Sequence, residues 1–479
     1  MPFPRNFGRA FRRRIKSLYP NTDGSLAIPF ALGAVVMMVA IGAAVDMGRW
    51  LHARNQTSKA IDAAVLAGAQ VYVTSKKDTA AGLEAARKFY EQNVRSRLPV
   101  DEDTVNFAIN SDGDGIFATG HAYIDTPFLH FAGVDRLPLT NLAESENSGG
   151  SGAHFGNRGQ SVEVSLILDI TGSMAGSKLS DLKAAAKDLV DIVVWDDQSE
   201  FYSKVALIPY SQGVNLGSSL ATTARGSVKS GTATTPGSQK YTFSNASNGR
   251  NTTFSVSNCI SERTGSNAYT DASPSTAKVG FNYPASNNPC PDAQIVPLTK
   301  DKSRLNDAID DYKASGSTAG HIGLAWGWYT LSPKWNSVFT GSSAPAAYSK
   351  LTEIGPKGLP LLKKIAVLMT DGDFNTAYCN GVISKDAGTG SGSAADHINC
   401  NATNGSSTSQ ALKLCTEMKK SGIVVYTVGF DVGNQAAARS VMQDCATDPT
   451  KVYIAGDGEQ LRTAFRDIAM NMLALYLSK

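Results

Sequence analysis

A carboxylate and two hydroxyl groups follow one short apolar segment near the middle of the chain. Residues 163–168 read Glu-Val-Ser-Leu-Ile-Leu, and Asp169, Thr171 and Ser173 come directly after them in a turn that also contains glycines. The segment is short and rich in β-forming residues, which predicts a buried strand ending at Asp169. Open α/β sheets bind their ligands at the carboxyl ends of strands, so this turn is a candidate site.

Oxygen atoms clustered in this way suit a hard divalent cation. Mg²⁺ takes about six oxygen ligands and usually keeps several waters among them. Two later segments offer oxygens of the same kind. Residues 316–320 read Gly-Ser-Thr-Ala-Gly before a helical pattern, and the apolar residues 365–369 end in Thr370, Asp371 and Gly372. Three separated segments therefore supply side chains that one cation can bind.

Together, the three segments resemble the metal-ion-dependent adhesion site (MIDAS) of von Willebrand factor A (VWA) domains. In that family a threonine from a second loop and an aspartate from a third complete the site. The resemblance assigns the metal ligands to Asp169, Thr171, Ser173, Thr318 and Asp371. It implies Mg²⁺ as the cation, with Mn²⁺ or Ca²⁺ as alternatives, and a protein partner whose acidic side chain supplies the missing oxygen.

Two enzyme classes have similar sequence motifs at their active sites. Aspartic proteases need Asp-Thr-Gly without an intervening residue, whereas Ile170 separates Asp169 from Thr171. Phosphotransferases with an aspartyl nucleophile need a second aspartate where Thr171 stands. The ordinary alternative is a strand-to-helix turn in which Asp169 and Ser173 are only caps. The match of three separated segments favours the metal site over that alternative.

Hydrolysis is the least favoured function. The sequence contains neither Gly-x-Ser-x-Gly nor His-Glu-x-x-His, the motifs that supply a serine nucleophile or a zinc centre. His321 lies three residues after Thr318, and a single histidine at a helix start is expected to be a solvated turn residue. We therefore predict a binding protein and not an enzyme, with metal-assisted hydrolysis as the weakest alternative.

The charge and cysteine content of the chain bear on whether it binds nucleic acid or zinc or forms disulfides. With 45 basic and 42 acidic residues, the chain gives no argument for binding nucleic acid. The six cysteines all lie in the carboxyl half, without CxxC and without a histidine cluster, so disulfides in an extracytoplasmic domain are favoured over a zinc site. Several connectivities are possible. Sequential pairing is the hypothesis because it staples local loops: Cys259 with Cys290, Cys379 with Cys400, and Cys415 with Cys445.

An uncharged segment near the amino terminus predicts a membrane anchor. Residues 25–45 are 21 positions without a charged side chain, and a helix needs about 20 to cross the hydrocarbon core. Six basic residues precede the first acidic one, Asp23, so the amino terminus is expected in the cytoplasm. A cleaved secretory signal is the alternative. The helical pattern continues to Gln70, which favours a retained single-pass anchor in a bacterial inner membrane with the rest periplasmic or exported.

The same region resembles the TadE/TadG-like proteins of Tad (tight adherence, or Flp) pilus assembly. The resemblance rests on Asp46-Met47-Gly48-Arg49, on residues 61–69 (Ile-Asp-Ala-Ala-Val-Leu-Ala-Gly-Ala), and on Ala27, Phe30, Ala31 and Leu32. Pilin-like members carry Glu five residues after a cleavage-site Gly, whereas Pro29 stands five residues after Gly24. The resemblance therefore implies a TadG-like anchored protein and not a minor pilin.

The chain divides into five predicted parts. These are a cytoplasmic basic segment (1–24), the transmembrane helix with its continuation (25–70), a small α+β module (71–145), a linker (146–160) and a VWA-like domain (161–479). In the module we expect a helix over 79–94 and alternating, strand-like runs over 105–109, 116–124 and 128–132. In the last part strands alternate with helices, which predicts a doubly wound, mostly parallel, Rossmann-like α/β sheet. A polar segment, about 213–297, interrupts it as an insertion.

Two interpretations of the continuing helix stay open. Ala60, Ala63, Ala64, Ala67 and Gly68 form a face of small side chains. Such a face lets a second helix approach closely, or it belongs to an alanine-rich helix that lies on its own domain.

Both resemblances lead to one functional hypothesis. The chain is expected to be a membrane-anchored, exported binding protein of Tad/Flp pilus assembly or adhesion, and its metal site engages a pilus component or an envelope or surface protein. The alternative is a structural envelope or pilus-assembly scaffold in which the metal only braces loops.

Overall fold

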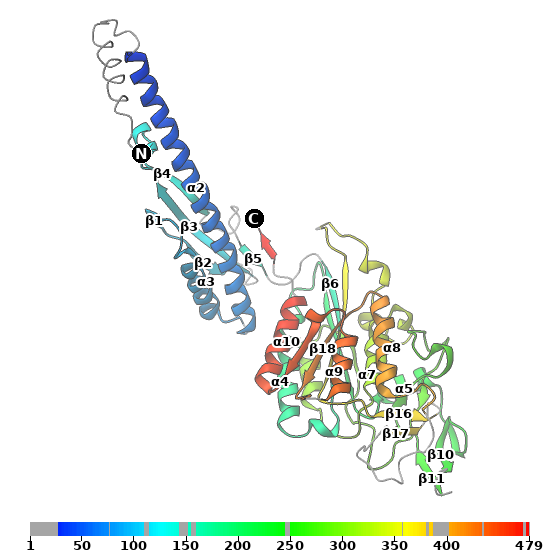
Figure 1. Ribbon diagram of the computed structural model, residues 1–479. Coiled ribbons are helices and arrows are strands. Elements are labelled where there is room, and N and C mark those ends of the chain that lie inside the picture. The colour runs from blue at the N-terminus through cyan, green and yellow to red at the C-terminus, as the bar shows by residue number, and fades with distance from the viewer. Residues whose placement is uncertain are drawn as a thin grey trace, which may run out of the picture. The chain divides into compact units, whose positions relative to one another are not determined.

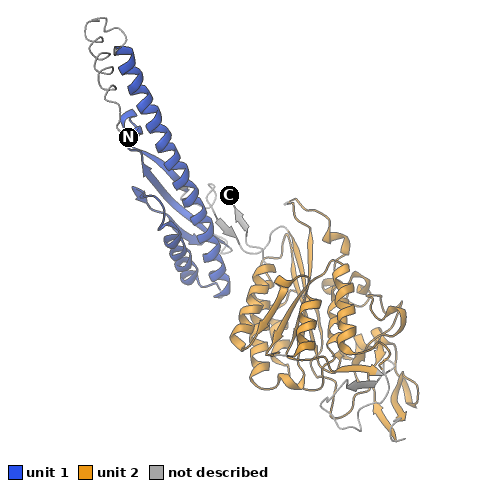
Figure 2. Cartoon of the chain, viewed as in Figure 1, with its two compact units in different colours: residues 1–154, 476–479 blue, residues 155–475 orange. Residues whose placement is uncertain are grey.

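The computed structural model describes residues 27–75, 77–109, 115–142, 152–154, 160–244, 250–356, 358–379, 383–386, 402–433, 435–472 and 476–478. The chain forms two compact units: unit 1 contains residues 1–154 and 476–479, and unit 2 contains residues 155–475 (Figure 2). Each unit has its own hydrophobic core.

One long helix, α2 (Ala27–Thr74), organises unit 1 (Figure 1). Its large apolar side chains between Ile28 and Val45 are exposed, and this part is long and apolar enough to cross a membrane. From Asp46 onward, one side of the helix is buried within the unit. The predicted continuation of the helix beyond the apolar segment is confirmed.

The small side chains of α2 pack on a helix of the same unit. This helix, α3 (Thr79–Val94), begins at Asp78, whose side chain accepts a hydrogen bond from the Ala81 amide at 3.1 Å. A Cβ placed on Gly68 would lie only 2.6 Å from the Cβ of Ala86. Gly68 therefore permits the close approach, and the small-residue face packs within its own domain.

A small antiparallel sheet completes unit 1. Its central strand, β3 (Gly115–Asp125), pairs with four others: β1 (Glu102–Asp103), β2 (Asn106–Ile109), β4 (Arg136–Leu142) and β5 (Gly152–His154). The last strand of the chain, β20 (Tyr476–Ser478), pairs with β5. Ala53 of α2 packs against Ala122, Ile124 and Leu139 of the sheet. α3 and the sheet thus form a small α+β arrangement on α2, and the sheet includes β5 and β20, which lie outside the predicted module bounds of 71–145.

One strand-like expectation in this module is wrong. Residues 128–132 do not form a strand, because Leu129–Ala132 form a short 3-10 helix, η1. The Asp46 carboxylate accepts hydrogen bonds from the amides of Phe128 and Leu129, both at 2.8 Å, and so caps the start of η1. Gly133, with a φ of 84°, ends it. A contact from a residue more than 80 positions away therefore overrides the local alternation.

Unit 2 is built on a six-stranded sheet. Its strand order is β14 (Val296–Thr299), β7 (Ser203–Tyr210), β6 (Ser161–Asp169), β15 (Leu362–Thr370), β18 (Val424–Phe430) and β19 (Val452–Ala455). Every pair is parallel except β14 with β7, at the edge. All nine residues of β6 are buried, as its central position requires.

Helices cover both faces of this sheet. α4 (Ser177–Val193), α6 (Lys302–Asp310) and α10 (Gly458–Met472) pack on one face, where β6 presents Val164, Leu166 and Leu168. α7 (Gly320–Leu331), α8 (Ser407–Lys420) and α9 (Ala436–Cys445) pack on the other, where β6 presents Ile167. Figure 1 shows α4 and α10 on one side of the strands and α8 on the other. The predicted doubly wound α/β fold is confirmed.

The polar segment predicted as an insertion is folded where the structure describes it. It contains α5 (Gly217–Arg225) and strands β8 (Val214–Asn215), β9 (Lys229–Ala233), β10 (Ser238–Ser244), β11 (Asn251–Ser255), β12 (Cys259–Ser261) and β13 (Gly280–Phe281). These strands form two three-stranded sheets. After β15, the strands β16 (Thr376–Cys379) and β17 (Ile383–Asp386) form a separate hairpin.

Two of the three predicted disulfides are confirmed. Cys259 is bonded to Cys290 within the insertion, and Cys415 of α8 is bonded to Cys445 of α9. Cys400, the predicted partner of Cys379, lies outside the described residues. That third pairing stays a prediction.

Helix α7 lies unusually close to the sheet through glycines. A Cβ on Gly323 would lie 2.7 Å from Cδ1 of Tyr210, and one on Gly327 would lie 2.3 Å from Cδ1 of Ile167. Contacts this short force neighbouring atoms to move. The glycines therefore determine how closely α7, whose first turn follows Thr318, packs on the sheet.

Replacing Gly323 by alanine tests this packing. Alanine is the better helix former by about 1 kcal/mol, yet we expect Gly323→Ala to destabilise unit 2 by about 1–3 kcal/mol through overpacking. Thermal unfolding of the purified full-length protein measures the change. Gly456→Ala is the matched control, because its added methyl meets only Gln460 at 3.6 Å. A higher melting temperature for Gly323→Ala would contradict the close contact.

Candidate functional site

The strand register places two carboxylates at the same edge of the sheet. Asp169 is the last residue of β6, and Asp371 directly follows the last residue of β15. The two strands are parallel neighbours, with Leu168 opposite Met369. Two of the predicted metal ligands therefore come from adjacent strand ends.

Hydrogen bonds connect the loop that carries Thr318 to the loops that follow Asp169 and Asp371. The Gly172 amide donates to the carbonyl of Gly316 at 2.9 Å, which joins the Asp169 turn to the loop before α7. In that loop, the Thr318 amide donates to Oδ1 of Asn375 at 2.9 Å. The Asn375 amide donates back to the Thr318 carbonyl at 3.0 Å. The loop that carries Thr318 thus lies between the other two loops.

Asp169 is fully buried and surrounded by donors. Its Oδ1 accepts from the Thr171 amide at 2.9 Å and the Thr171 hydroxyl at 2.6 Å. Its Oδ2 accepts from Thr370 Oγ1 at 2.7 Å and from the Tyr210 hydroxyl at 3.3 Å. Burial, together with the negative charge of Asp371, raises the pKa of Asp169 to about 6, although hydrogen bonds from Thr171 and Thr370 favour the ionised form.

Two of the three predicted hydroxyl ligands form a chain between the two carboxylates. Ser173 Oγ donates to Asp371 Oδ1 at 2.7 Å, just as Thr171 Oγ1 donates to Asp169 Oδ1. The two hydroxyl oxygens lie 3.0 Å apart. The structure therefore joins four of the five predicted residues through their side chains, whereas the backbone of Thr318 bonds to Asn375 in the loop that follows Asp371.

A lysine supplies positive charge beside the site. Lys178 Nζ lies 3.1 Å from Oδ2 of Asp371 and 3.0 Å from Oδ2 of Asp431. Partial burial lowers the pKa of Lys178, but the hydrogen bonds to Asp431 and Asp371 outweigh that effect, so its pKa is raised. Asp431 has a left-handed backbone, with a φ of 52°. This conformation is uncommon for a residue other than glycine.

Sequence reasoning did not identify three residues that contact the predicted ligands, or a fourth, Asp431, that contacts one of these three. They are Lys178, Tyr210, Thr370 and Asp431. Three of them end or follow a strand of the parallel sheet, and Lys178 lies in the first turn of the helix after Ser173. The rule that ligands bind at the carboxyl ends of strands was the signal available to find them.

The expectation for His321 is wrong. This residue is buried and not a solvated turn residue. Its Nδ1 lies 2.7 Å from Ser407 Oγ of α8, and its Nε2 pairs with the Glu262 carboxylate of the insertion. His321 therefore connects α7, α8 and the insertion beneath the Thr318 loop.

The donor set of the candidate site is of one chemical kind. Within the described parts of the chain, no group of three or more His, Cys, Asp or Glu side chains could hold a metal ion. The five predicted residues instead offer two carboxylates and three hydroxyls. Such a set suits Mg²⁺ or Ca²⁺ better than metals that prefer nitrogen or sulfur ligands.

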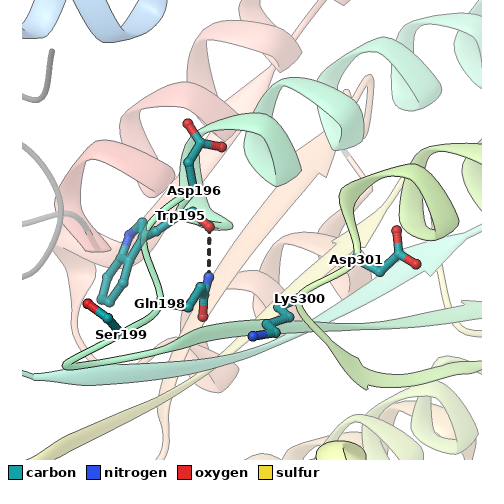
Figure 3. Close-up of a pocket in the computed structure, with 6 residues that line it drawn as sticks. All are labelled: Trp195, Asp196, Gln198, Ser199, Lys300 and Asp301. Atoms are coloured by element: carbon teal, nitrogen blue, oxygen red, sulfur yellow. Dashed lines mark hydrogen bonds between the residues drawn. The ribbon is translucent and has the colours of Figure 1, made fainter. Parts of the chain in front are cut away.

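A hollow at the other end of the sheet is separate from this site. It has a volume of about 580 Å³ and is lined by Trp195, Asp196, Gln198, Ser199, Lys300 and Asp301 (Figure 3). These residues lie near the start of β7 and the end of β14, whereas Asp169 lies opposite Tyr210 at the other end of β7. Across the same two segments, Lys302 pairs with Asp196 at 2.8 Å. The hollow is thus remote from the carboxylates.

The amino-terminal segment matches a known family. Residues 24–71 match the Tad family model, described as Flp pilus-assembly TadE/G-like. The predicted TadE/TadG-like resemblance is confirmed over this segment. No curated protein matches the chain.

Solved structures with similar folds include adhesins. The vWF domain of the type V pili tip protein Mfa5 from Porphyromonas gingivalis is 12% identical, and the match covers 65% of this chain and 95% of that one (TM-score 0.35). The pilus adhesin SpaC from Lactobacillus rhamnosus GG is 14% identical, and the match covers 78% of this chain and 36% of that one (TM-score 0.36). Proximal thread matrix protein 1 from the mussel byssus, with a zinc-occupied MIDAS motif, is 14% identical, and the match covers 65% of this chain and 47% of that one (TM-score 0.30). At these scores, the fold assignment rests on the strand order and helix placement described above.

The raised pKa of Asp169 predicts a pH dependence of stability without metal. Between its ordinary pKa of 3.8 and about 6, the folded protein binds more protons at Asp169 than the unfolded protein does. The contribution of Asp169 to the free energy of unfolding therefore falls as pH rises through this window. Urea unfolding in EDTA at a series of pH values, for the wild type and Asp169→Asn, measures it. The stability of the wild type relative to the variant should fall across the window, and a constant difference would contradict the raised pKa.

Proposed function

We propose that this chain, whose residues 24–71 are TadE/G-like, is a membrane-anchored, metal-dependent binding protein of Tad/Flp pilus assembly or adhesion. Its unit 2 would engage a protein partner through a divalent cation bound at Asp169, Thr171, Ser173, Thr318 and Asp371. The family match supports the role in pilus biology. The geometry of the oxygens supports the cation.

The observation that carries the metal proposal is the contact between two hydroxyl oxygens. Thr171 and Ser173 each donate to a carboxylate, yet their oxygens lie only 3.0 Å apart. A hydroxyl has a single hydrogen, so with both carboxylates ionised two hydrogens serve three close contacts, and one pair of oxygens has no hydrogen between them. Two ligands at right angles on Mg²⁺, with bonds of about 2.1 Å, are also about 3.0 Å apart. The spacing suits a cation bound to both.

The exposure of the site suits a partner that completes it. Asp169 and Thr171 are buried, whereas Ser173 is exposed at the surface. A partner protein can approach a cation bound by these residues from the side of Ser173 and supply a further oxygen ligand. An acidic side chain of a protein partner provides both that oxygen and the opposite charge. The cation is Mg²⁺ in this proposal, and Mn²⁺ or Ca²⁺ fit the same oxygens.

The anchor sets where this site is displayed. The exposed apolar part of α2 supports a single-pass membrane protein. Basic residues precede this part, so the positive-inside rule puts the amino terminus in the cytoplasm and the residues that follow the membrane segment outside it. The confirmed disulfides fit an oxidising compartment. In this proposal unit 2 faces the periplasm of a bacterial inner membrane or lies beyond it.

A structural scaffold is the second candidate function, and one observation favours it. The three loops are already joined to one another by backbone hydrogen bonds. A metal added to such a framework could brace the loops without contacting a partner. The two candidates differ in what removal of the metal does to partner binding.

Metal binding is tested by calorimetric titration of the full-length protein in detergent with Mg²⁺. We expect Asp371→Asn to weaken Mg²⁺ binding by more than about tenfold, because loss of a direct ligand exceeds the loss of an outer contact. The asparagine side chain can still accept the hydrogen bond from Ser173, so the loop is retained.

Asp301→Asn is the matched control for this titration. Asp301 lies at the opposite end of the sheet and caps α6 by accepting from the Arg304 amide, a role that asparagine also fills. This variant should bind Mg²⁺ as the wild type does. Equal Mg²⁺ affinity of the wild type and Asp371→Asn would rule out the proposed site.

The role of the metal is tested in cells that produce the chain. Asp371→Asn should abolish adhesion or pilus assembly while the protein level and membrane insertion stay at wild-type values, because the variant changes only the partner-binding site. Adhesion assays and immunoblots of membrane fractions measure these outcomes. Normal assembly and adhesion in a variant that no longer binds Mg²⁺ would favour the scaffold.

A further inference from the structure

The short helix η1 and the residues on either side of it carry apolar side chains on the surface of unit 1. Phe131 is 82% exposed, Phe128 is 45% exposed and Val134 is 37% exposed. Large apolar residues gathered on one turn of an otherwise polar surface mark an interaction site. The position of η1 along α2 indicates what this site contacts.

Two contacts fix η1 at the end of the apolar part of α2. A Cβ on Gly42 would lie 2.6 Å from the Cβ of Phe128, so the phenylalanine packs directly on the helix backbone. One turn later, the buried Asp46 carboxylate accepts hydrogen bonds from the Phe128 and Leu129 amides, both at 2.8 Å. η1 therefore has a defined level on α2, where the short cyan helix lies beside α2 in Figure 1.

The surface of α2 changes from apolar to mixed at this level. Val39, Ile41 and Val45 precede Asp46 and are exposed, whereas the exposed Met47 and Leu51 that follow Asp46 are interspersed with Arg49 and Arg54. After Asp46 comes Trp50, with the Arg54 guanidinium 5.1 Å from its ring centroid. Aromatic and basic side chains are enriched where the hydrocarbon core meets the lipid headgroups. η1 thus lies at the boundary between the two kinds of surface.

We propose that Phe131 of η1 and the preceding Phe128 insert into the leaflet of the bilayer that α2 spans, on the side where the residues that follow the membrane segment lie. The inference rests on the proposed anchor. Lipid is the occupant because Phe128 packs on the membrane segment at Gly42, beside the exposed Ile41 and Val45. His130 and Asp135, which are exposed and paired at 2.6 Å beside η1, then lie among the headgroups. The α+β part of unit 1 therefore contacts the membrane through η1 as well as through α2.

The test measures how deeply η1 lies in lipid. An environment-sensitive fluorescent amino acid replaces Phe131 in the full-length protein, which is reconstituted in vesicles of phosphatidylethanolamine and phosphatidylglycerol. Phospholipids brominated on their acyl chains serve as the quencher. We expect a blue-shifted emission from position 131 and loss of most of its intensity with brominated lipid.

Two matched positions separate the outcomes. Val36, exposed within the apolar part of α2, should be quenched if α2 spans the bilayer. Phe89, an exposed apolar residue of α3, should not be, because α3 packs on α2 near Gly68, roughly 39 Å along the helix from Gly42. Quenching at 36 without quenching at 131 overturns the inference and leaves the anchor intact. No quenching at 36 overturns both.

A protein partner for η1 is the remaining outcome. A photo-crosslinking benzophenone amino acid at position 131, irradiated in intact cells, should form adducts with lipid. A discrete protein adduct in place of lipid would assign η1 to a protein partner and overturn the inference.

Discussion

The parallel pairing of β6 with β15 is the constraint on which the rest of the candidate site depends. It brings the ends of two buried strands together, and each end carries an aspartate. Two buried carboxylates side by side are costly, because each loses hydration and they repel each other. The neighbouring groups reduce this cost: Tyr210, Thr171 and Thr370 donate to Asp169, while Ser173 and Lys178 donate to Asp371. A divalent cation would offset the remaining repulsion.

The fold of unit 2 was accessible from the sequence because its central strands are buried. β6 and β15 each contain an apolar stretch that ends in a polar turn, so the existence of these strands follows from composition. The alternation with helices then fixes a parallel sheet. The five predicted ligands followed from three motif segments, and hydrogen bonds connect the loops that carry them.

What the sequence did not predict depends on contacts between distant residues. η1 is capped by Asp46, and His321 is buried because Glu262 and Ser407 satisfy both of its ring nitrogens. The edge strand β14 has only four residues and runs antiparallel, so it lacks a long apolar pattern. Asp431 reaches Lys178 only because β18 lies beside β15. No local pattern encodes such contacts.

The two disulfides of unit 2 have a consequence for biogenesis. Their cysteines are 31 and 30 residues apart, and closing loops of this length contributes about 3–4 kcal/mol each in the chain-entropy model. In the proposed topology, both bonds would be absent in the reducing cytoplasm, so the newly made polypeptide would be less stable there than after export. Oxidation after export would then stabilise the folded domain only in the compartment where it is displayed.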